Sequence, residues 1–172
     1  WKYNDKNENI GTDFSTLEYD DSGWSTGPGI FGVDTGTFPT PGLQTPLQRD
    51  SSNNLLTYYF RKEFEFNDDP IGSMINIEAI LDDGARFWIN GQEITRVRLP
   101  AYPEEVNWKT RASSNIPFRD EKKLLPITSI DGSGFLVEGK NLFAIDLHNS
   151  SPGSSDVVVG ATLDIAAQPA GA

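Results

Sequence analysis

The feature of this sequence that most limits its fold is a series of runs in which apolar and polar side chains alternate. In the first clear run, TYYFRKEFEF at residues 57–66, one face carries Tyr58, Phe60, Phe64 and Phe66. A period of two belongs to an extended strand, because successive side chains point to opposite faces. No stretch longer than about two turns keeps the period of a helix. The pattern predicts a protein built from β-strands.

Further alternating runs, and the turn residues between them, indicate the architecture. The other runs lie at residues 73–81, 141–149 and 156–165, and a strand pair surrounds Asn90-Gly91. Several short strands separated by turn-forming residues are typical of an antiparallel β-sandwich. We therefore expect an all-β fold, either a sandwich or its jelly-roll form.

The length of the chain limits the number of domains. Its 172 residues suffice for one domain with a real core. We expect a single β-sandwich module over residues 1–165, with a loop-rich N-terminal part at residues 1–54, where turn-forming residues are frequent. Residues 166–172, AAQPAGA, have the composition of a linker, and we expect them to form a linker-like tail.

The composition argues against several classes of protein. The net charge of −11 argues against nucleic-acid binding, because phosphate contacts need clustered lysine and arginine. The chain has no cysteine, which removes thiol catalysis, thiolate metal sites and disulfides. Its apolar runs are too short for membrane insertion. The chain begins with Trp1 and nothing there reads as a signal peptide, so we expect an extracellular module cut from a larger secreted protein.

The dipeptide Asn90-Gly91 predicts a tight hairpin. It stands between two alternating runs, and a type I′ turn needs a positive φ at both central residues, which asparagine and glycine tolerate. The pairs that a two-residue turn predicts are Ile89 with Gln92, Trp88 with Glu93, and Phe87 with Ile94. Paired residues point to the same side of a sheet. Phe87, Ile89 and Ile94 therefore face the core.

Trp88 then lies on the outward face of this hairpin, between charged residues, and two interpretations remain open. An exposed indole ring is a platform on which a sugar ring can stack. The alternative is that Trp88 packs beneath the N-terminal loops, because tryptophan is highly buried on average.

The pair Asp82-Asp83 just before the hairpin also has two interpretations. Two adjacent carboxylates offer the hard oxygen ligands that Ca²⁺ prefers. Aspartate and glycine are also the ordinary residues of a turn between strands, and no EF-hand spacing accompanies the pair. Spacing alone favours the turn.

A long segment after the hairpin, RVRLPAYPEEVNWKTRASSN at residues 96–115, is the most cationic part of an acidic chain. Long loops in compact domains tend to be functional. Tyr102 and Trp108 can stack on sugar rings, while Arg96 and Arg111 can bind hydroxyl groups or acidic glycans. The alternative is a loop that folds over the edge of the sandwich with its aromatic rings buried.

Two patterns resemble catalytic motifs, and neither has the required context. The run GWSTG matches a nucleophile elbow at Ser25, but that motif needs a helix after it, and Pro28-Gly29 follows here. His148 is the only histidine, and Ser154 and Asp156 stand downstream, but closeness in sequence is no evidence for a triad. We expect a protein that is not an enzyme.

Several segments together resemble a group of galactose-binding-like jelly-roll modules. They are YFRKEFEF, DDGARFWINGQEITR, LVEGKNLFAIDLHNSSPGSSDVVVGATLDI and the opening DDSGWSTGPGIFG. Modules of that group are appended to secreted bacterial multidomain proteins, where they are usually non-catalytic accessories. A looser likeness links DDGARFWING to PA14-type lectin domains, in which paired aspartates hold Ca²⁺ that binds sugar hydroxyls. That likeness implies Asp82 and Asp83 as calcium ligands.

The resulting expectation is a non-catalytic extracellular module that binds polysaccharide and stands beside neighbouring domains of a larger protein. The predicted ligand-binding residues are Trp88, Arg96, Tyr102, Trp108 and Arg111. The alternative function is a structural or assembly module that packs against neighbouring domains or identical subunits.

Overall fold

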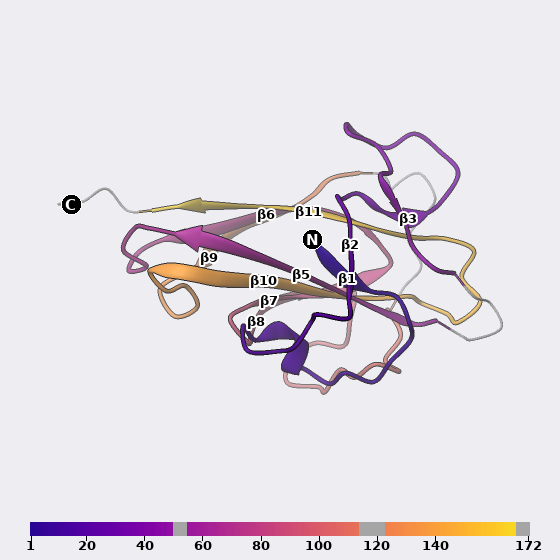
Figure 1. The fold of residues 1–172 in the computed structure, drawn as a ribbon, viewed down its shortest axis with the longest axis horizontal. Helices are drawn as coiled ribbons and strands as arrows, with labels where there is room; N and C mark the ends of the chain where they lie inside the picture. The colour runs from indigo at the N-terminus through magenta and orange to yellow at the C-terminus, as the bar shows by residue number, and fades with distance from the viewer. Residues whose placement is uncertain (50–54, 114–122, 168–172) are drawn as a thin grey trace.

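The computed structural model describes residues 1–49, 55–113 and 123–167, and within them the chain forms two β-sheets (Figure 1). The first sheet has six strands in the order β2-β1-β5-β10-β7-β8, and the second has five in the order β4-β3-β11-β6-β9. The strands are β1 Lys2–Asn4, β2 Ser25–Thr26, β3 Phe31–Val33, β4 Thr45–Pro46, β5 Thr57–Phe66, β6 Met74–Asp82, β7 Gly84–Ile89, β8 Gln92–Val97, β9 Leu125–Asp131, β10 Gly139–His148 and β11 Val157–Ala166.

The fold is all-β, as the alternating runs predict. A short 3₁₀ turn, η1 at Asp13–Ser15, is the one helical element in the described residues. No helix in these parts of the chain is long and apolar enough to cross a membrane. Every pairing in the two sheets is antiparallel except that of β3 with β4, which is parallel. The fold is therefore a sandwich with one short parallel pair at an edge.

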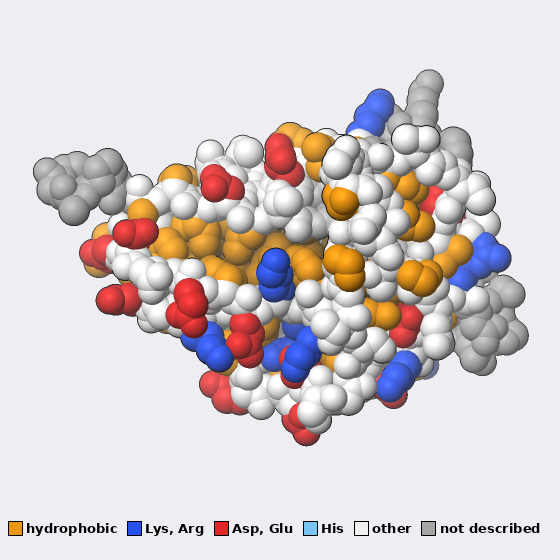
Figure 2. Space-filling view, turned by 45° about the horizontal axis from the view of Figure 1, so that its top comes forward, with side chains coloured by type: hydrophobic (Ala, Val, Ile, Leu, Met, Phe, Trp, Pro, Cys, Tyr) orange, Lys and Arg blue, Asp and Glu red, His pale blue; other side chains and the backbone are white. Residues whose placement is uncertain are grey.

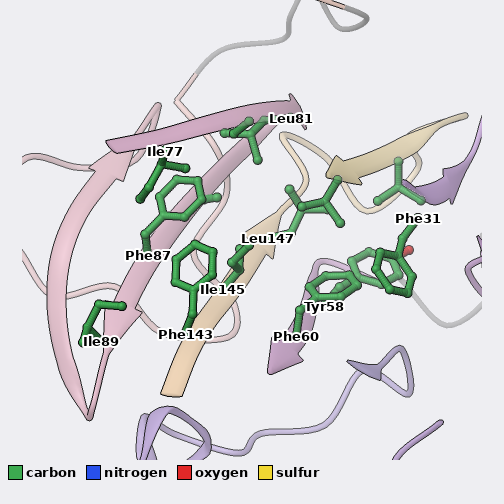
Figure 3. Close-up of a cluster of buried hydrophobic side chains, with 14 of the residues drawn as sticks. Phe31, Tyr58, Phe60, Ile77, Leu81, Phe87, Ile89, Phe143, Ile145 and Leu147 are labelled. Carbon is green, nitrogen blue, oxygen red and sulfur yellow. The ribbon is translucent and has the colours of Figure 1, made fainter. Parts of the chain in front are cut away.

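The long strands supply the core between the two sheets (Figure 3). Their inward side chains are those that the alternation predicts. From the first sheet they are Tyr58, Phe60, Phe66, Phe87, Ile89, Phe143, Ile145 and Leu147; from the second they are Ile75, Ile77, Ala79, Leu81, Val157 and Val159. Full burial of one large apolar side chain contributes roughly 1.5–3 kcal/mol, so this layer is the main stabilising element of the fold.

The hairpin between β7 and β8 confirms part of the predicted pairing. Asn90 has a φ of 49° and Gly91 a φ of 85°, as a type I′ turn requires. Ile89 pairs with Gln92, and Trp88 with Glu93. The third predicted pair is wrong, because a bulge shifts the register and Phe87 pairs with Thr95.

The N-terminal part covers the outer face of the first sheet. A second apolar cluster forms there between η1 and the outward side chains of the long strands; its buried members are Phe14, Tyr59, Trp88, Leu142 and Ala144. Arg61 points to the same side and is only 2% exposed. It donates hydrogen bonds to the Asp21 carboxylate and to the carbonyl oxygens of Phe14 and Thr16. One buried guanidinium thus attaches the N-terminal segment to β5.

The two sheets differ in how far their short edge strands reach. β1 pairs with β5 only as far as Arg61, and β3 pairs with β11 only over Val157–Val159. The residues after these points, in the second halves of β5 and β11, have a paired neighbour on one side only among the described residues. One long side of the sandwich is therefore open. The strand β11 includes Ala166, the first residue of the predicted tail, and residues 168–172 lie outside the described residues.

Candidate functional site

The segment that follows β8 folds over the end of the first sheet, where Arg98 and Ala112 attach its two ends. Arg98 donates from Nη1 to the Asp83 carbonyl oxygen at 2.6 Å, and the Ala112 amide donates to the Asn149 carbonyl oxygen at 3.1 Å. A Cβ atom on Gly84 would lie only 2.8 Å from the Arg98 carbonyl oxygen. Glycine at this position allows the close approach of the segment to β7.

Arg96, near the end of β8, forms hydrogen bonds to the main chain of this segment. Its Nε and Nη2 donate to the two carboxylate oxygens of Glu93, and its Nη1 donates to the carbonyl oxygens of Pro100 and Glu104 at 2.8 and 2.9 Å. These hydrogen bonds occupy four of the five N–H donors of the guanidinium. The role that the structure gives Arg96 is to hold the loop in place.

The aromatic and basic residues of the loop differ in exposure. Tyr102 is 83% exposed, and the Arg96 guanidinium carbon lies 6.0 Å from the centroid of its ring. Trp108 is half-buried with the Lys109 ammonium 5.1 Å from its ring, and Arg111 is exposed. The loop does fold over the sandwich, as one alternative expected, but its buried side chains are aliphatic: Leu99, Val106 and Ala112. Tyr102 therefore offers an open face at the surface.

Trp88 requires a correction to the platform interpretation. It does lie on the outward face of the hairpin, but η1 covers that face and the ring is only 6% exposed. Its neighbours include Phe14 at a centroid distance of 6.0 Å and the Arg86 guanidinium at 4.8 Å. The ring packs beneath the N-terminal segment, which was the other interpretation, and it leaves no open face for a sugar.

A buried group of charged side chains surrounds Asp146 on this face. Its carboxylate is fully buried and accepts hydrogen bonds from Arg86 Nε at 2.9 Å, Trp88 Nε1 at 2.7 Å and His148 Nε2 at 2.7 Å. Burial alone would raise the pKa of Asp146, but the hydrogen bonds and positive charges of His148 and Arg86 outweigh burial and lower this pKa below its ordinary value. The group ties β7 to β10.

His148 connects this group to the loop. Its Nδ1 lies 2.8 Å from the Thr110 carbonyl oxygen and 3.2 Å from the Thr57 hydroxyl, which itself donates to the Trp108 carbonyl oxygen. A carbonyl oxygen only accepts, so Nδ1 donates to it, while Nε2 donates to the Asp146 carboxylate. The two ring nitrogens thus join the loop backbone to the Asp146 carboxylate.

The two patterns that resembled catalytic motifs have no catalytic geometry. Ser25 lies in β2, where it pairs with Tyr3, and no helix follows it. Ser154 donates to Asp156 at 3.1 Å, while His148 is directed to Asp146 and the loop. The described residues therefore assemble neither an elbow nor a serine–histidine–aspartate triad at these positions.

Asp82 and Asp83 are both buried at the end of β6 beside a positive side chain. The Asp83 carboxylate accepts the Ser150 amide at 2.6 Å. Burial lowers the pKa of the Arg98 guanidinium, and the negative charges of Asp83 and Asp82 oppose that change. No group of three or more histidine, cysteine, aspartate or glutamate side chains that could hold a metal ion occurs in the part of the chain that the structure describes. The Ser150 amide and the Arg98 guanidinium attach the Asp83 end of this pair to two neighbouring segments.

A groove on the open long side of the sandwich is the feature that sequence reasoning missed. It has a volume of about 600 Å³ and lies between the second halves of β5 and β11. Its aromatic lining comes from Trp1, Phe64, Phe66 and Phe143. Alternation identifies Phe64, Phe66 and Phe143 as inward-facing. That the core layer is open beside them follows only from the short lengths of β1 and β3, which the sequence does not reveal.

Comparisons with known proteins give no family. No family model matches the chain, and no curated protein matches it. Among solved structures, a β-glucuronidase of glycoside hydrolase family 2 has 18% identity and a TM-score of 0.48, over 87% of this chain and 13% of that one. A β-glycosidase from Bacteroides vulgatus has 15% identity and a TM-score of 0.47, over 95% of this chain and 19% of that one. The chain thus spans a fifth or less of the length of these two proteins. We assign its fold from the strand order of its two sheets and not from these similarities.

Proposed function

We propose that this chain is a non-catalytic, extracellular carbohydrate-binding module of a larger protein, and that it binds polysaccharide on the loop after β8. The observation that carries the proposal is Tyr102, a residue that is 83% exposed on a loop that is otherwise attached to the sheet. Aromatic rings can stack on the apolar faces of sugar rings. A ring on a loop that is already ordered can do so without the entropic cost of ordering the loop on binding.

The neighbours of Tyr102 on this loop support the same function. Trp108 is half-buried, while Arg111 is exposed. Arginine donates fixed pairs of hydrogen bonds to carboxylates, so an exposed Arg111 would favour an acidic polysaccharide. Arg96 serves the site indirectly, because it holds the loop backbone under Tyr102.

The test is a binding measurement on neutral and acidic polysaccharides. Affinity electrophoresis in gels that contain xylan, laminarin, alginate or polygalacturonate would show retardation in at least one gel. Loss of one stacking ring costs about 0.5–1.5 kcal/mol, so Tyr102→Ala should weaken binding roughly 2- to 10-fold. The matched control is Ile71→Ala, which removes another highly exposed apolar side chain from outside this loop.

Two results would contradict this function. One is the absence of retardation in every gel; the other is binding that Tyr102→Ala and Trp108→Ala leave unchanged. If Arg111→Ala weakens binding to the acidic polysaccharides but not to the neutral ones, the preference for an acidic ligand is supported.

A further inference from the structure

The groove on the open long side of the sandwich is an apolar slot with polar margins. Its apolar lining is given above, together with Ala161, Leu163 and Ile165 from β11. Figure 2 shows hydrophobic side chains gathered in a hollow, with acidic side chains at its margins and a basic side chain over it. A second hollow of about 890 Å³ continues past Trp1 toward Pro39–Pro41. Together they form a trough along the sandwich.

The burial along β11 shows why the trough is apolar. The inward side chains Val157 and Val159 are fully or almost fully buried where β3 pairs beside them. After Val159 that pairing ends, and Ala161, Leu163 and Ile165 point to the same core but remain half-exposed. The apolar core layer thus continues along β5 and β11 for several residues beyond the points where the pairings with β1 and β3 end.

Among the residues that the structure describes, the backbone along this edge is also without a partner strand. From Gly160 to Ala166, β11 pairs with β6 on one side, and no described strand lies on the other. β5 has the same arrangement after Arg61. An open edge with unpaired N–H and C=O groups is a template for another strand.

We propose that this trough binds an extended polypeptide segment of a partner protein, which adds as a strand to the free edge of β11. The main chain of the segment would pair with residues 160–166. Its alternate side chains would enter the trough and cover Phe64, Leu163 and Ile165, which closes the core layer. This is strand addition, in which main-chain hydrogen bonds give affinity and pockets for alternate side chains give selectivity.

Charge specifies the partner further. The carboxylates of Glu65 and Asp68 line the trough and are exposed, against one lysine, Lys62, whose ammonium lies 6.0 Å from the Trp1 ring. The whole chain carries a net charge of −11, so a second copy would be repelled. The segment that fits has alternating apolar residues flanked by lysine or arginine.

A synthetic peptide tests the proposal directly. In the peptide, valine alternates with threonine between paired lysines at both ends; a control peptide has glutamates in place of the lysines. We expect the lysine peptide to bind with a micromolar dissociation constant in calorimetry and the glutamate peptide to bind at least about tenfold more weakly. Hydrogen exchange should show new protection of the amides of residues 160–166, and an unchanged exchange there would contradict the proposal.

Matched variants locate the peptide. Leu163→Lys places a charge inside the trough and should abolish binding, whereas Asp164→Lys, at an exposed position on the other face of the same strand and outside the lining, should not. If Leu163→Lys does not fold, the double variant Glu65→Lys with Asp68→Lys still decides, because it should reverse the preference between the two peptides. An unchanged preference in that folded variant would overturn the proposal.

Other occupants give different results, and each would overturn the inference. A polysaccharide that protects residues 160–166 and competes for them would make the trough a glycan site. Self-association that rises with protein concentration and disappears in Leu163→Lys would make a second copy the occupant. If the lysine peptide does not bind at concentrations up to millimolar, the edge of β11 does not bind peptides by strand addition. None of these results depends on Tyr102, so this proposal and the carbohydrate-binding function are tested separately.

Discussion

At the scale of single residues, buried charges connect parts of the chain that are far apart in sequence. Asp146 and His148 are both fully buried, and Arg86 is nearly so. A buried charge is costly unless it is paired, and removal of one partner leaves the others uncompensated. Asp146 is the centre of this group, since three donors share its carboxylate. Its role is to fix the arrangement of β7, β10 and the loop.

The first prediction concerns this carboxylate and acid. Asp146→Asn should lower the free energy of unfolding by about 3–5 kcal/mol at neutral pH, because Arg86 and His148 lose their buried counter-charge. The folded pKa of Asp146 lies below its ordinary value, and that of Asp21 is likewise lowered by Lys2 and Arg61 although burial would raise it. A lowered folded pKa contributes stability above the unfolded value of about 3.9, and this stability is lost as the pH falls below that value.

Urea unfolding between pH 7 and pH 3 checks this prediction. Stability of the unmodified chain should decline below about pH 4, and the decline should be shallower in Asp146→Asn. The control is Lys140→Ala, which breaks an exposed pair with Glu63 and should leave the stability and its acid dependence almost unchanged, because water and salt screen such pairs. An equal acid dependence in the parent and in Asp146→Asn would show that this carboxylate is not involved.

At the scale of elements, the sequence predicts the long strands that bury one face. It misses the short strands, which are determined by pairing with neighbouring strands and not by a pattern of their own. The bounds of β5 are those of its alternating run, and Asn90-Gly91 forms the predicted turn. The short strands β1 to β4 have two or three residues each and carry too little pattern to be seen. The bulge opposite Trp88 is likewise invisible, because it depends on local twist and not on side-chain type.

The candidate site was predictable to a similar degree. Sequence singled out the loop as a candidate, and Tyr102 is exposed on it. Alternation placed Trp88 on the correct face, but a period of two does not reveal which segment covers that face. The hydrogen bonds of Arg96 to main-chain carbonyls could not be foreseen either, because any residue supplies such an acceptor.

The second prediction concerns the junction of β7 with the loop. Gly84→Ala should lower the free energy of unfolding by about 1–3 kcal/mol, because the added methyl group would press on the carbonyl oxygens of Val97 and Arg98. Gly134→Ala is the control, since a Cβ atom there meets no other atom within 4 Å. Thermal unfolding of both variants gives the comparison, and equal melting temperatures would contradict the close packing at Gly84.

At the scale of the whole molecule, three surfaces have different characters. The outer face of the first sheet is covered by the N-terminal segment, and the end of that sheet is covered by the loop with Tyr102. The long side between β5 and β11 is open and apolar. The molecule thus has two separate surfaces on which a partner could be bound, one with an exposed aromatic ring and one with an unpaired strand edge.

The third prediction concerns calcium and the stability of the molecule. A ligand that binds only the folded state raises its stability by mass action. Arg98 donates a hydrogen bond to the Asp83 carbonyl oxygen and supplies positive charge beside this pair, so we expect the melting temperature to be the same in excess EDTA and in millimolar Ca²⁺. A rise of several degrees with Ca²⁺ that Asp83→Asn removes would restore the calcium interpretation of this pair. Mg²⁺ at the same concentration is the control for general ionic effects.

The way in which the domain holds its loop has a practical consequence. Arg96, Thr57 and His148 all bind main-chain carbonyl oxygens of the loop, at Pro100, Glu104, Trp108 and Thr110. Every peptide unit carries such an oxygen, whatever its side chain. The outward side chains of this loop can therefore be randomised without removing the hydrogen bonds that attach its main chain to the sandwich. The sandwich is in effect a disulfide-free display scaffold, on which libraries at Tyr102 and its exposed neighbours could be selected for new ligands.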